Sequence, residues 1–139
     1  MLDTSCLAAY FGAEPTSSLA AAVVDGLVRS GRNSAVVSAV SVTELLVRPL
    51  RSGAGDVERS ILAFLRTFPN LEVVPIDLTV SRLAAVVRAR FGLKTPDALI
   101  VACGFDRSVG IALSDDAGWP EQLSLEAATM RVMALRAFV

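Results

Sequence analysis

Acidic side chains stand just after apolar strands or in the first turns of helices at several separate places in this sequence. They are Asp3, Glu44, Asp97, Asp115 and Asp116. Like charges that are brought together repel and raise one another's pKa unless a cation neutralises them. Carboxylate oxygens are the ligands preferred by hard divalent ions such as Mg²⁺ and Mn²⁺, and such ions activate water for phosphodiester hydrolysis. If these residues converge in the fold, the sequence therefore predicts a metal-dependent hydrolytic site.

Asp97 stands at the start of a strongly apolar helix. Thr95 is expected to be the N-cap, and Pro96 fits the first helical position, where no backbone N–H is needed. Asp97 then lies in the first turn, where free N–H groups and the helix dipole favour a carboxylate. Residues 98–103 are wholly apolar, which predicts a helix covered on most sides. Asp97 is either a capping charge only or a member of the acidic site.

The other acidic residues also have simpler interpretations. The segment Ser41-Val42-Thr43-Glu44 is a good capping box, in which Glu44 would reach back to the start of its own helix. Asp115 and Asp116 are compatible with a plain turn or a helix N-cap. Asp3 is compatible with a solvated charge close to the beginning of the sequence. Pattern alone leaves these alternatives open.

The amino-acid composition excludes several kinds of site and of protein. The sequence has no His, which excludes His general bases, His-containing triads and His-ligated zinc. The formal net charge is −1, so no overall basic field indicates nucleic acid. Mean hydropathy is +0.57, but no apolar run reaches the ~18 residues of a membrane span. No signal peptide is visible, and the two cysteines suggest no disulfide framework, which favours a cytoplasmic protein.

The predicted helices and strands alternate along the chain. Helices are predicted at 4–11, 17–30, 41–50, 57–68, 78–90 and 95–105, and strands at 1–3, 35–38, 71–76 and 109–113. A last strand is predicted at 130–135, although 126–136 also fits a helix. Wholly apolar strands that alternate with helices predict an α/β fold, a parallel sheet covered on both faces, in one domain over 1–139. In such folds ligands bind beyond the carboxyl ends of the strands, where the acidic residues fall.

Four motifs carry a family resemblance. They are Leu2-Asp3-Thr4-Ser5, the segment from Ser38 through Thr43-Glu44-Leu45, Thr95-Pro96-Asp97-Ala98-Leu99-Ile100, and Leu113-Ser114-Asp115-Asp116-Ala117-Gly118-Trp119. In order and spacing they resemble the signatures of PIN-domain ribonucleases, in particular the VapC toxins of type II toxin–antitoxin systems. The resemblance spans residues 1 to about 119.

The resemblance implies a three-layer α/β/α PIN-like fold with a mainly parallel five-stranded sheet of order 3-2-1-4-5. It implies an Mg²⁺- or Mn²⁺-dependent endoribonuclease toxin that inhibits translation or growth, and a VapB-like antitoxin whose tail covers the acidic pocket. A homodimer is also expected. Only Met1 and Leu2 precede Asp3, so the first strand is either unusually short or begins upstream.

By resemblance, Asp3, Glu44, Asp97 and Asp116 match the family's catalytic acids, with Asp3, Asp97 and Asp116 as metal ligands. The family's last signature usually runs Thr-x-Asp-x-x-Phe. Here Ser114 supplies the hydroxyl and Trp119 the aromatic ring, which makes Asp116 the matching acid and Asp115 a possible substitute. Supporting roles fall to Ser5 and Ser114, whose hydroxyls can hold a carboxylate or a metal-bound water. Thr4 and Thr43 are expected to cap or pack.

Substrate contacts and alternative functions complete the prediction. Arg48, Arg51 and Lys94 can contact RNA phosphates or remain solvated surface charges. Trp119 and Tyr10 are expected to pack rather than to stack on bases. A non-catalytic PIN-like module that cradles RNA or antitoxin is the main alternative. A receiver-like phosphate-handling domain fits less well, because the paired acids follow a late strand and the only lysine precedes a helix.

Overall fold

The computed structural model describes residues 1–12 and 15–138, and its elements follow the predicted alternation. The helices are α1 (Thr4–Phe11), α2 (Ser17–Val23), the π-helix η1 (Val24–Val28), α3 (Ala39–Ser52), α4 (Gly55–Thr67), α5 (Leu78–Phe91), α6 (Thr95–Asp106) and α7 (Leu135–Phe138). The strands are β1 (Ala35–Ser38), β2 (Leu71–Val74), β3 (Ile111–Leu113), β4 (Gln122–Leu125) and β5 (Ala128–Met133).

The strands form two sheets that the N-terminal segment joins. β1 pairs in parallel with β2, and β5 lies between β3, its parallel partner, and β4, its antiparallel partner. Between the sheets, the Leu2 N–H donates to the Val36 carbonyl at 2.9 Å and the Asp3 N–H donates to the Leu113 carbonyl at 3.0 Å. Residues 1–3 therefore lie between β1 and β3, with Asp3 at the carboxyl end of β3.

Residues 1–3 take the place of the expected short first strand between β1 and β3, but they form a bridge rather than a full strand, so the strands belong to a two-stranded and a three-stranded sheet. The segment 1–3 makes a single parallel bridge, from Leu2 to Leu113, because α1 begins directly after it at Thr4. The C-terminal prediction was also incomplete. The strand interpretation of the tail is confirmed by β5, but β5 is one arm of a hairpin whose other arm, β4, was not predicted.

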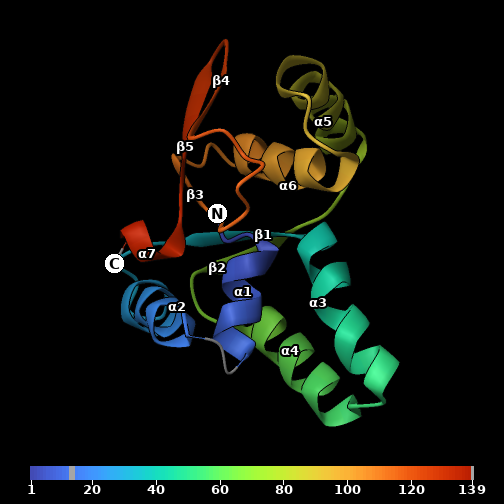
Figure 1. Cartoon of the computed structure of the whole chain (residues 1–139), viewed down its shortest axis with the longest axis vertical. Coiled ribbons are helices and arrows are strands. Elements are labelled where there is room, and N and C mark those ends of the chain that lie inside the picture. The colour runs from blue at the N-terminus through green and yellow to red at the C-terminus, as the bar shows by residue number, and fades with distance from the viewer. Residues whose placement is uncertain (13–14, 139) are drawn as a thin grey trace.

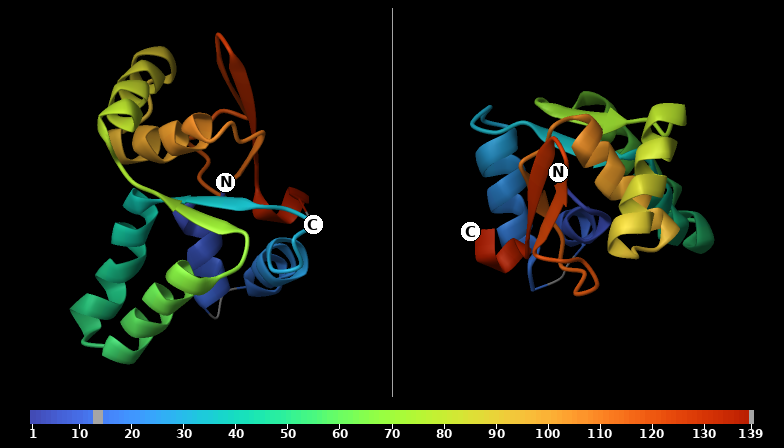
Figure 2. Two further views of the ribbon diagram at one scale, coloured as in Figure 1. Left: turned by 180° about the vertical axis from the view of Figure 1, so that it is seen from behind. Right: turned by 90° about the horizontal axis from the view of Figure 1, so that it is seen from above.

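Helices cover both faces of the central strands, as the α/β prediction required (Figure 1). α1, α2, α3 and α4 lie on one side, and α5 and α6 lie on the other, while the β4–β5 hairpin rises at the edge (Figure 2). Each side has its own buried cluster, one around Leu7, Val37 and Leu65, the other around Val87, Ile100 and Met130. Among the described residues no helix is long and apolar enough to cross a membrane.

The two helices that carry Glu44 and Asp97 begin at residues, and with caps, that differ from the prediction. α3 begins at Ala39 and is capped by Ser38, whose Oγ accepts from the Val40 N–H, so the capping box at Ser41 was wrong. α6 begins at Thr95, with Lys94 rather than Thr95 at the N-cap position and without a side-chain cap bond. The early proline and the placement of Asp97 in the first turn are confirmed.

The helix predicted over 17–30 also changes character part-way. α2 ends at Val23, and the next turn is the wider π-helix η1, in which the Arg29 N–H donates to the Val24 carbonyl at 2.9 Å. Arg29 still pairs with Asp25, four residues earlier, at 3.0 Å.

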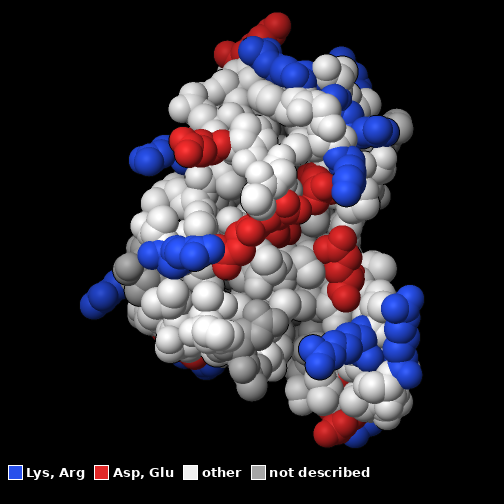
Figure 3. All heavy atoms as spheres, in the orientation of Figure 1, with Lys and Arg blue, Asp and Glu red and all other residues white. Residues whose placement is uncertain are grey.

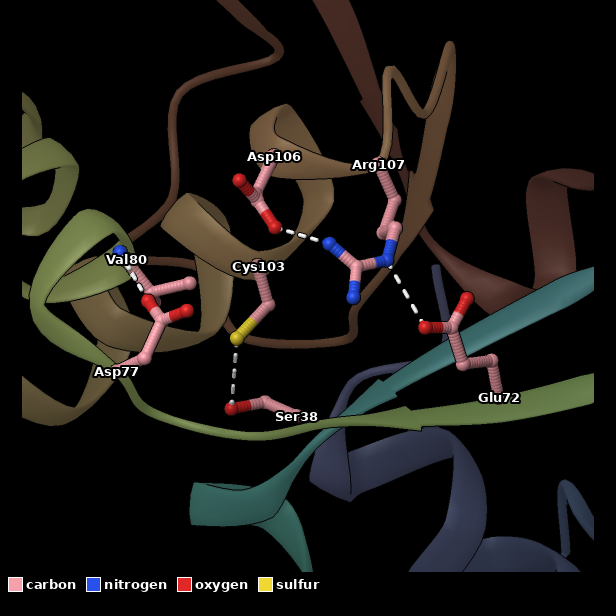
Figure 4. Close-up of polar contacts among 7 residues, drawn as sticks. All are labelled: Ser38, Glu72, Asp77, Val80, Cys103, Asp106 and Arg107. Carbon is pink, nitrogen blue, oxygen red and sulfur yellow. Dashed lines mark hydrogen bonds and ion pairs between the residues drawn. The ribbon is translucent and has the colours of Figure 1, made fainter.

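Polar contacts fix α6 against the strands at two points (Figure 4). In the buried interior, Cys103 Sγ donates to Ser38 Oγ at 3.3 Å, which ties α6 to the end of β1 and the start of α3. At the end of the helix, Arg107 Nε donates to Glu72 Oε1 of β2 at 2.9 Å, and Arg107 also pairs with Asp106. α6 therefore has a defined position relative to α3, and the two helices carry Asp97 and Glu44.

Candidate active site

Asp3 is the centre of the candidate site. Its side chain lies where the N-terminal segment meets the carboxyl end of β3, and the residue is only 6% exposed. Asp3 Oδ2 accepts a hydrogen bond from Ser114 Oγ at 2.7 Å and another from Ser5 Oγ at 3.1 Å. Of the two roles expected for the Ser5 and Ser114 hydroxyls, the structure contains hydrogen bonds to a carboxylate, that of Asp3.

Burial dominates the electrostatics of this centre. Loss of water raises the pKa of Asp3, and the hydrogen bonds, the one from Ser114 first, oppose the shift. Burial, together with the nearby charges of Asp3 and Asp115, raises the pKa of Cys6 to about 12. Cys6 is therefore a neutral thiol, and it donates to the Leu113 carbonyl at 3.2 Å. Within the described chain no Lys or Arg forms an ion pair with Asp3.

Glu44 is joined to the centre through Thr4. The Thr4 hydroxyl donates to Glu44 Oε2, which links α3 to the residue that follows Asp3. Glu44 is exposed and does not reach back to the start of its own helix. The expectation that Thr4 only caps or packs was therefore wrong, and 40 residues of separation gave no local signal for this pair. Thr43 bonds within its own helix, to the Ala39 carbonyl at 3.3 Å.

The loop after β3 places the two neighbouring aspartates differently. The Asp115 N–H donates to Ser5 Oγ at 3.1 Å, and Asp115 Oδ1 accepts from the Leu135 N–H at 3.0 Å, at the start of α7. The Asp116 N–H donates to Ser114 Oγ at 3.2 Å, and Asp116 Oδ1 accepts from the Gly118 N–H at 2.7 Å. The Asp115 carboxylate thus holds the C-terminal segment, whereas the Asp116 carboxylate closes a local turn within the loop.

Asp97 is half-buried in the first turn of α6, and none of the described hydrogen bonds or ion pairs joins its side chain to the other acids. α6 packs against β1 and α3. Figure 3 shows acidic side chains in a band across the middle of one face, between the part formed by α5 and α6 and the part formed by α1 to α4, with basic side chains around it.

The described side chains do not form a complete set of metal ligands by themselves. Across residues 1–12 and 15–138, no three acidic or cysteine side chains lie close enough together to hold a metal ion. The direct links of the site join Asp3 to the loop after β3 and Thr4 to Glu44. The structure therefore connects Asp3, Glu44 and the Asp115–Asp116 loop through bonded neighbours and leaves Asp97 linked only through the packing of α6.

The aromatic residues near the site pack rather than face solvent. Trp119 is 7% exposed and belongs to the buried cluster beside α6. The Tyr10 ring contacts Phe11 and Phe64, and its hydroxyl donates to Asp25 Oδ1 at 3.1 Å. Both residues pack, as predicted: Trp119 is buried, and Tyr10 is half-buried against Phe11 and Phe64.

A groove of about 670 Å³ starts at the site and runs between α1, α3 and α4. Thr4 and Glu44 lie in its wall, so an occupant of this groove would touch the acidic centre. Most of its other lining residues are apolar, including Phe11, Pro49 and Ile61, and Arg48 also contributes.

Known structures and a protein-family model show what this chain is similar to. The structure is similar to a toxin–antitoxin complex from Klebsiella pneumoniae (TM-score 0.64, 18% identity, 86% of this chain and 91% of that chain). It is also similar to VapBC2 from Rickettsia felis bound to a promoter DNA fragment (0.66, 15%, 84% and 86%) and to FitAcB from Neisseria gonorrhoeae (0.60, 21%, 84% and 87%). A search of curated protein sequences gave no match. The PIN domain model matches residues 1–121, which is most of the sequence, and the chain therefore belongs to the PIN domain family.

Proposed function

We propose that this chain is the toxin of a VapBC-like toxin–antitoxin pair and acts as a metal-dependent endoribonuclease. PIN domains are generally nucleases, and the similar structures include a toxin–antitoxin complex and VapBC2 bound to its promoter DNA. The observation that carries the proposal is the buried Asp3 carboxylate, which two hydroxyls hold in place and no described cation pairs with. A buried carboxylate without a counter-charge is costly, and a bound cation removes that cost.

The donor set suits a hard divalent ion, because all of its members supply oxygen. Mg²⁺ usually keeps several waters and takes one or two carboxylates, so a site without three convergent side chains is compatible with it. Asp3, Asp97 and Asp116 are the residues that would hold the ion, one or two of them directly and the others through its bound waters. When bound, such an ion lowers the pKa of water and stabilises charge on phosphoryl oxygens.

The protein's own residues have distinct tasks in this proposal. Ser114 and Ser5 fix the orientation of the Asp3 carboxylate through hydrogen bonds to Oδ2. Thr4 fixes Glu44, which lies at the open edge of the site and can accept a proton from water near the RNA phosphate. Asp115 holds the loop to α7 and so keeps Asp116 in position.

The decisive experiment is Asp97→Asn, which tests whether the one acid without a bonded link belongs to the site. We expect the purified variant to keep its fold by circular dichroism and to lose Mg²⁺-dependent RNA cleavage, because an amide is a poor ligand for a hard cation. Asp106→Asn, at the other end of α6, is the matched control and should cleave like the wild type. Wild-type cleavage by Asp97→Asn would refute the site, and a wild-type protein without any RNA cleavage would favour the non-catalytic module.

An antitoxin partner is the second part of the proposal, and the groove beside Glu44 is its proposed seat. An apolar peptide segment suits the lining of this groove, and it would cover the acidic centre. We expect the product of the adjacent upstream reading frame to co-purify with the chain and to suppress cleavage. Val57→Glu, at a 44% exposed position in the groove, should weaken this association. Val86→Glu, at a 40% exposed position on α5, should not. Equal effects would exclude this groove as the seat.

A further inference from the structure

A second groove of about 640 Å³, lined by other residues than the apolar one, lies beside the acidic centre. Its first wall is the loop after β3, and its second wall is formed by β5 and α7. Ser114 lines the groove and also donates to Asp3, so the groove is continuous with the centre. The cationic residues of its walls are Arg131 on β5 and Arg136 on α7.

Both arginines are exposed, and neither forms an ion pair with any residue that the structure describes. This holds even though Asp115, Asp116 and Glu121 line the same groove. The Asp115 and Asp116 carboxylates accept backbone N–H groups instead. The guanidinium groups therefore keep their donors available for another anion.

We propose that this groove binds the backbone phosphates of single-stranded RNA on one side of the scissile bond, with Arg131 and Arg136 as the phosphate contacts. The inference rests on the proposed nuclease function and adds the path of the substrate. A strand that is cut at an acidic centre must pass its neighbouring phosphates over adjoining surface. Arginine suits that surface, because its planar fork can donate two parallel hydrogen bonds to one phosphate.

The linings of the two grooves favour different kinds of ligand. The groove between α1, α3 and α4 is mostly apolar and fits a peptide, whereas this groove offers two unpaired guanidinium groups beside the centre. Three carboxylates also line this groove: Asp116 is one that a divalent ion would neutralise, Asp115 is bonded to the Leu135 N–H, and Glu121 keeps its charge. Arg131 and Arg136 would hold the strand by charge at its phosphates without reading its bases.

The test measures binding of a labelled single-stranded RNA of random sequence to Asp97→Asn protein, which should bind without cutting. In that background, Arg131→Ala/Arg136→Ala should weaken binding on the order of tenfold or more. It should also reduce the salt slope of log K by about 1.4, which corresponds to two single-strand phosphate contacts. The matched control is Arg59→Ala/Arg66→Ala, which removes equal charge from exposed positions of α4 outside both grooves.

Several outcomes would overturn the proposal. One is unchanged affinity and salt slope in the Arg131/Arg136 variant, and another is an equal loss in the α4 control. A third is a variant that keeps RNA affinity but no longer retains the upstream-frame partner, because the groove would then belong to a protein. If the alanine variant does not fold, Arg131→Lys/Arg136→Lys is tested in its place. Lysine keeps the positive charge but lacks the planar guanidinium with its two parallel donors, so RNA affinity should fall by less than in the alanine variant.

Cleavage by the otherwise wild-type protein separates this proposal from the proposed function. If the wild type cuts RNA and the Arg131/Arg136 variant cuts it with unchanged KM, only the groove assignment fails. If the wild type cuts no RNA at all, the nuclease function fails with it. A raised KM with nearly unchanged kcat is the expected result, since these residues would contact substrate away from the reacting bond.

Discussion

The Ser114 hydroxyl donates a hydrogen bond of 2.7 Å to Asp3 Oδ2, although 111 residues separate the two in sequence. The bond is buried, and Ser114 Oγ also accepts from the Asp116 N–H. One hydroxyl thus joins the residue at the centre of the site to the loop that carries the fourth acid. Partners of this kind orient a ligating carboxylate and set its strength as a ligand.

Ser114→Ala should therefore impair both stability and cleavage. Loss of a hydrogen bond to a buried charged group should lower the unfolding free energy by about 1.5–3 kcal/mol, measured by urea denaturation. RNA cleavage should fall about 10–100-fold, the usual effect of removing a residue that orients a metal ligand. Ser60→Ala on α4, whose hydroxyl bonds only to the Asp56 carbonyl, is the control. Full cleavage by Ser114→Ala would contradict the role given to this bond.

Asp3→Asn should separate stability from activity. Burial raises the pKa of Asp3, so the folded protein holds this proton more tightly than the unfolded chain does. The associated stability is fully present below the ordinary carboxyl pKa and is lost as pH rises through the raised value. Without metal, Asp3→Asn should therefore be more stable than the wild type at neutral pH, and the advantage should shrink toward acid.

Denaturation curves from about pH 4 to about pH 8 measure this difference, because linkage makes its slope report the Asp3 proton. Added Mg²⁺ should stabilise the wild type and leave Asp3→Asn unchanged, since a ligand stabilises only the state that binds it. RNA cleavage should be lost in the variant. A wild type that is insensitive to Mg²⁺ in both stability and cleavage would contradict a metal site at Asp3.

Much of the fold could be predicted from the sequence because its signals are local. Apolar runs and the early Pro96 indicate where elements begin, and α5 and α6 form close to the predicted positions. Strand pairing is not local. The reduction of residues 1–3 to one bridge depends on how early α1 starts, and the β4–β5 hairpin has no strong turn residue to announce it.

Some contacts of the site could likewise be predicted from local patterns, and others could not. Convergence of Asp3 with Ser5 and Ser114 follows from the ends of neighbouring strands meeting, which the alternation of strands and helices predicts. The pairing of Thr4 with Glu44 is a contact between residues 40 apart in sequence, so it depends on how α1 and α3 pack. The capping box at Ser41 suggested that Glu44 would bond to the start of its own helix. In the structure Ser38 caps that helix, and Glu44 accepts from Thr4 instead.

Thr4→Val should test whether the hydroxyl positions Glu44. Valine keeps the shape of threonine and removes the donor, so Glu44 loses its only described hydrogen bond. Cleavage should fall about tenfold, the lower end of the effect expected for such partners. Thr4→Ser, which restores the hydroxyl, should recover most of the activity. Thr43→Val, one residue from Glu44, should have little effect, because the Thr43 hydroxyl bonds to the Ala39 carbonyl. A Thr4→Ser variant as poor as Thr4→Val would indicate packing instead.

Asp115 and Asp116 should give opposite results, although both substitutions remove one negative charge from the same loop. Asp115 Oδ1 accepts from the Leu135 N–H at the start of α7, and Asp115→Ala should cost about 0.5–2 kcal/mol of stability, as loss of an N-cap does. Its cleavage should change little once the protein is folded. Asp116→Asn keeps an oxygen for the Gly118 N–H, so its stability should match the wild type.

Asp116→Asn should instead reduce RNA cleavage roughly a hundredfold or more, because loss of a residue that merely orients a ligand already costs 10–100-fold. Thermal unfolding and cleavage rates measured on both proteins, with and without Mg²⁺, distinguish the two roles. If Asp115→Ala abolished cleavage in a folded protein while Asp116→Asn stayed active, Asp115 would be the fourth acid. The bond to Leu135 would then be one that the carboxylate gives up when it binds a metal ion.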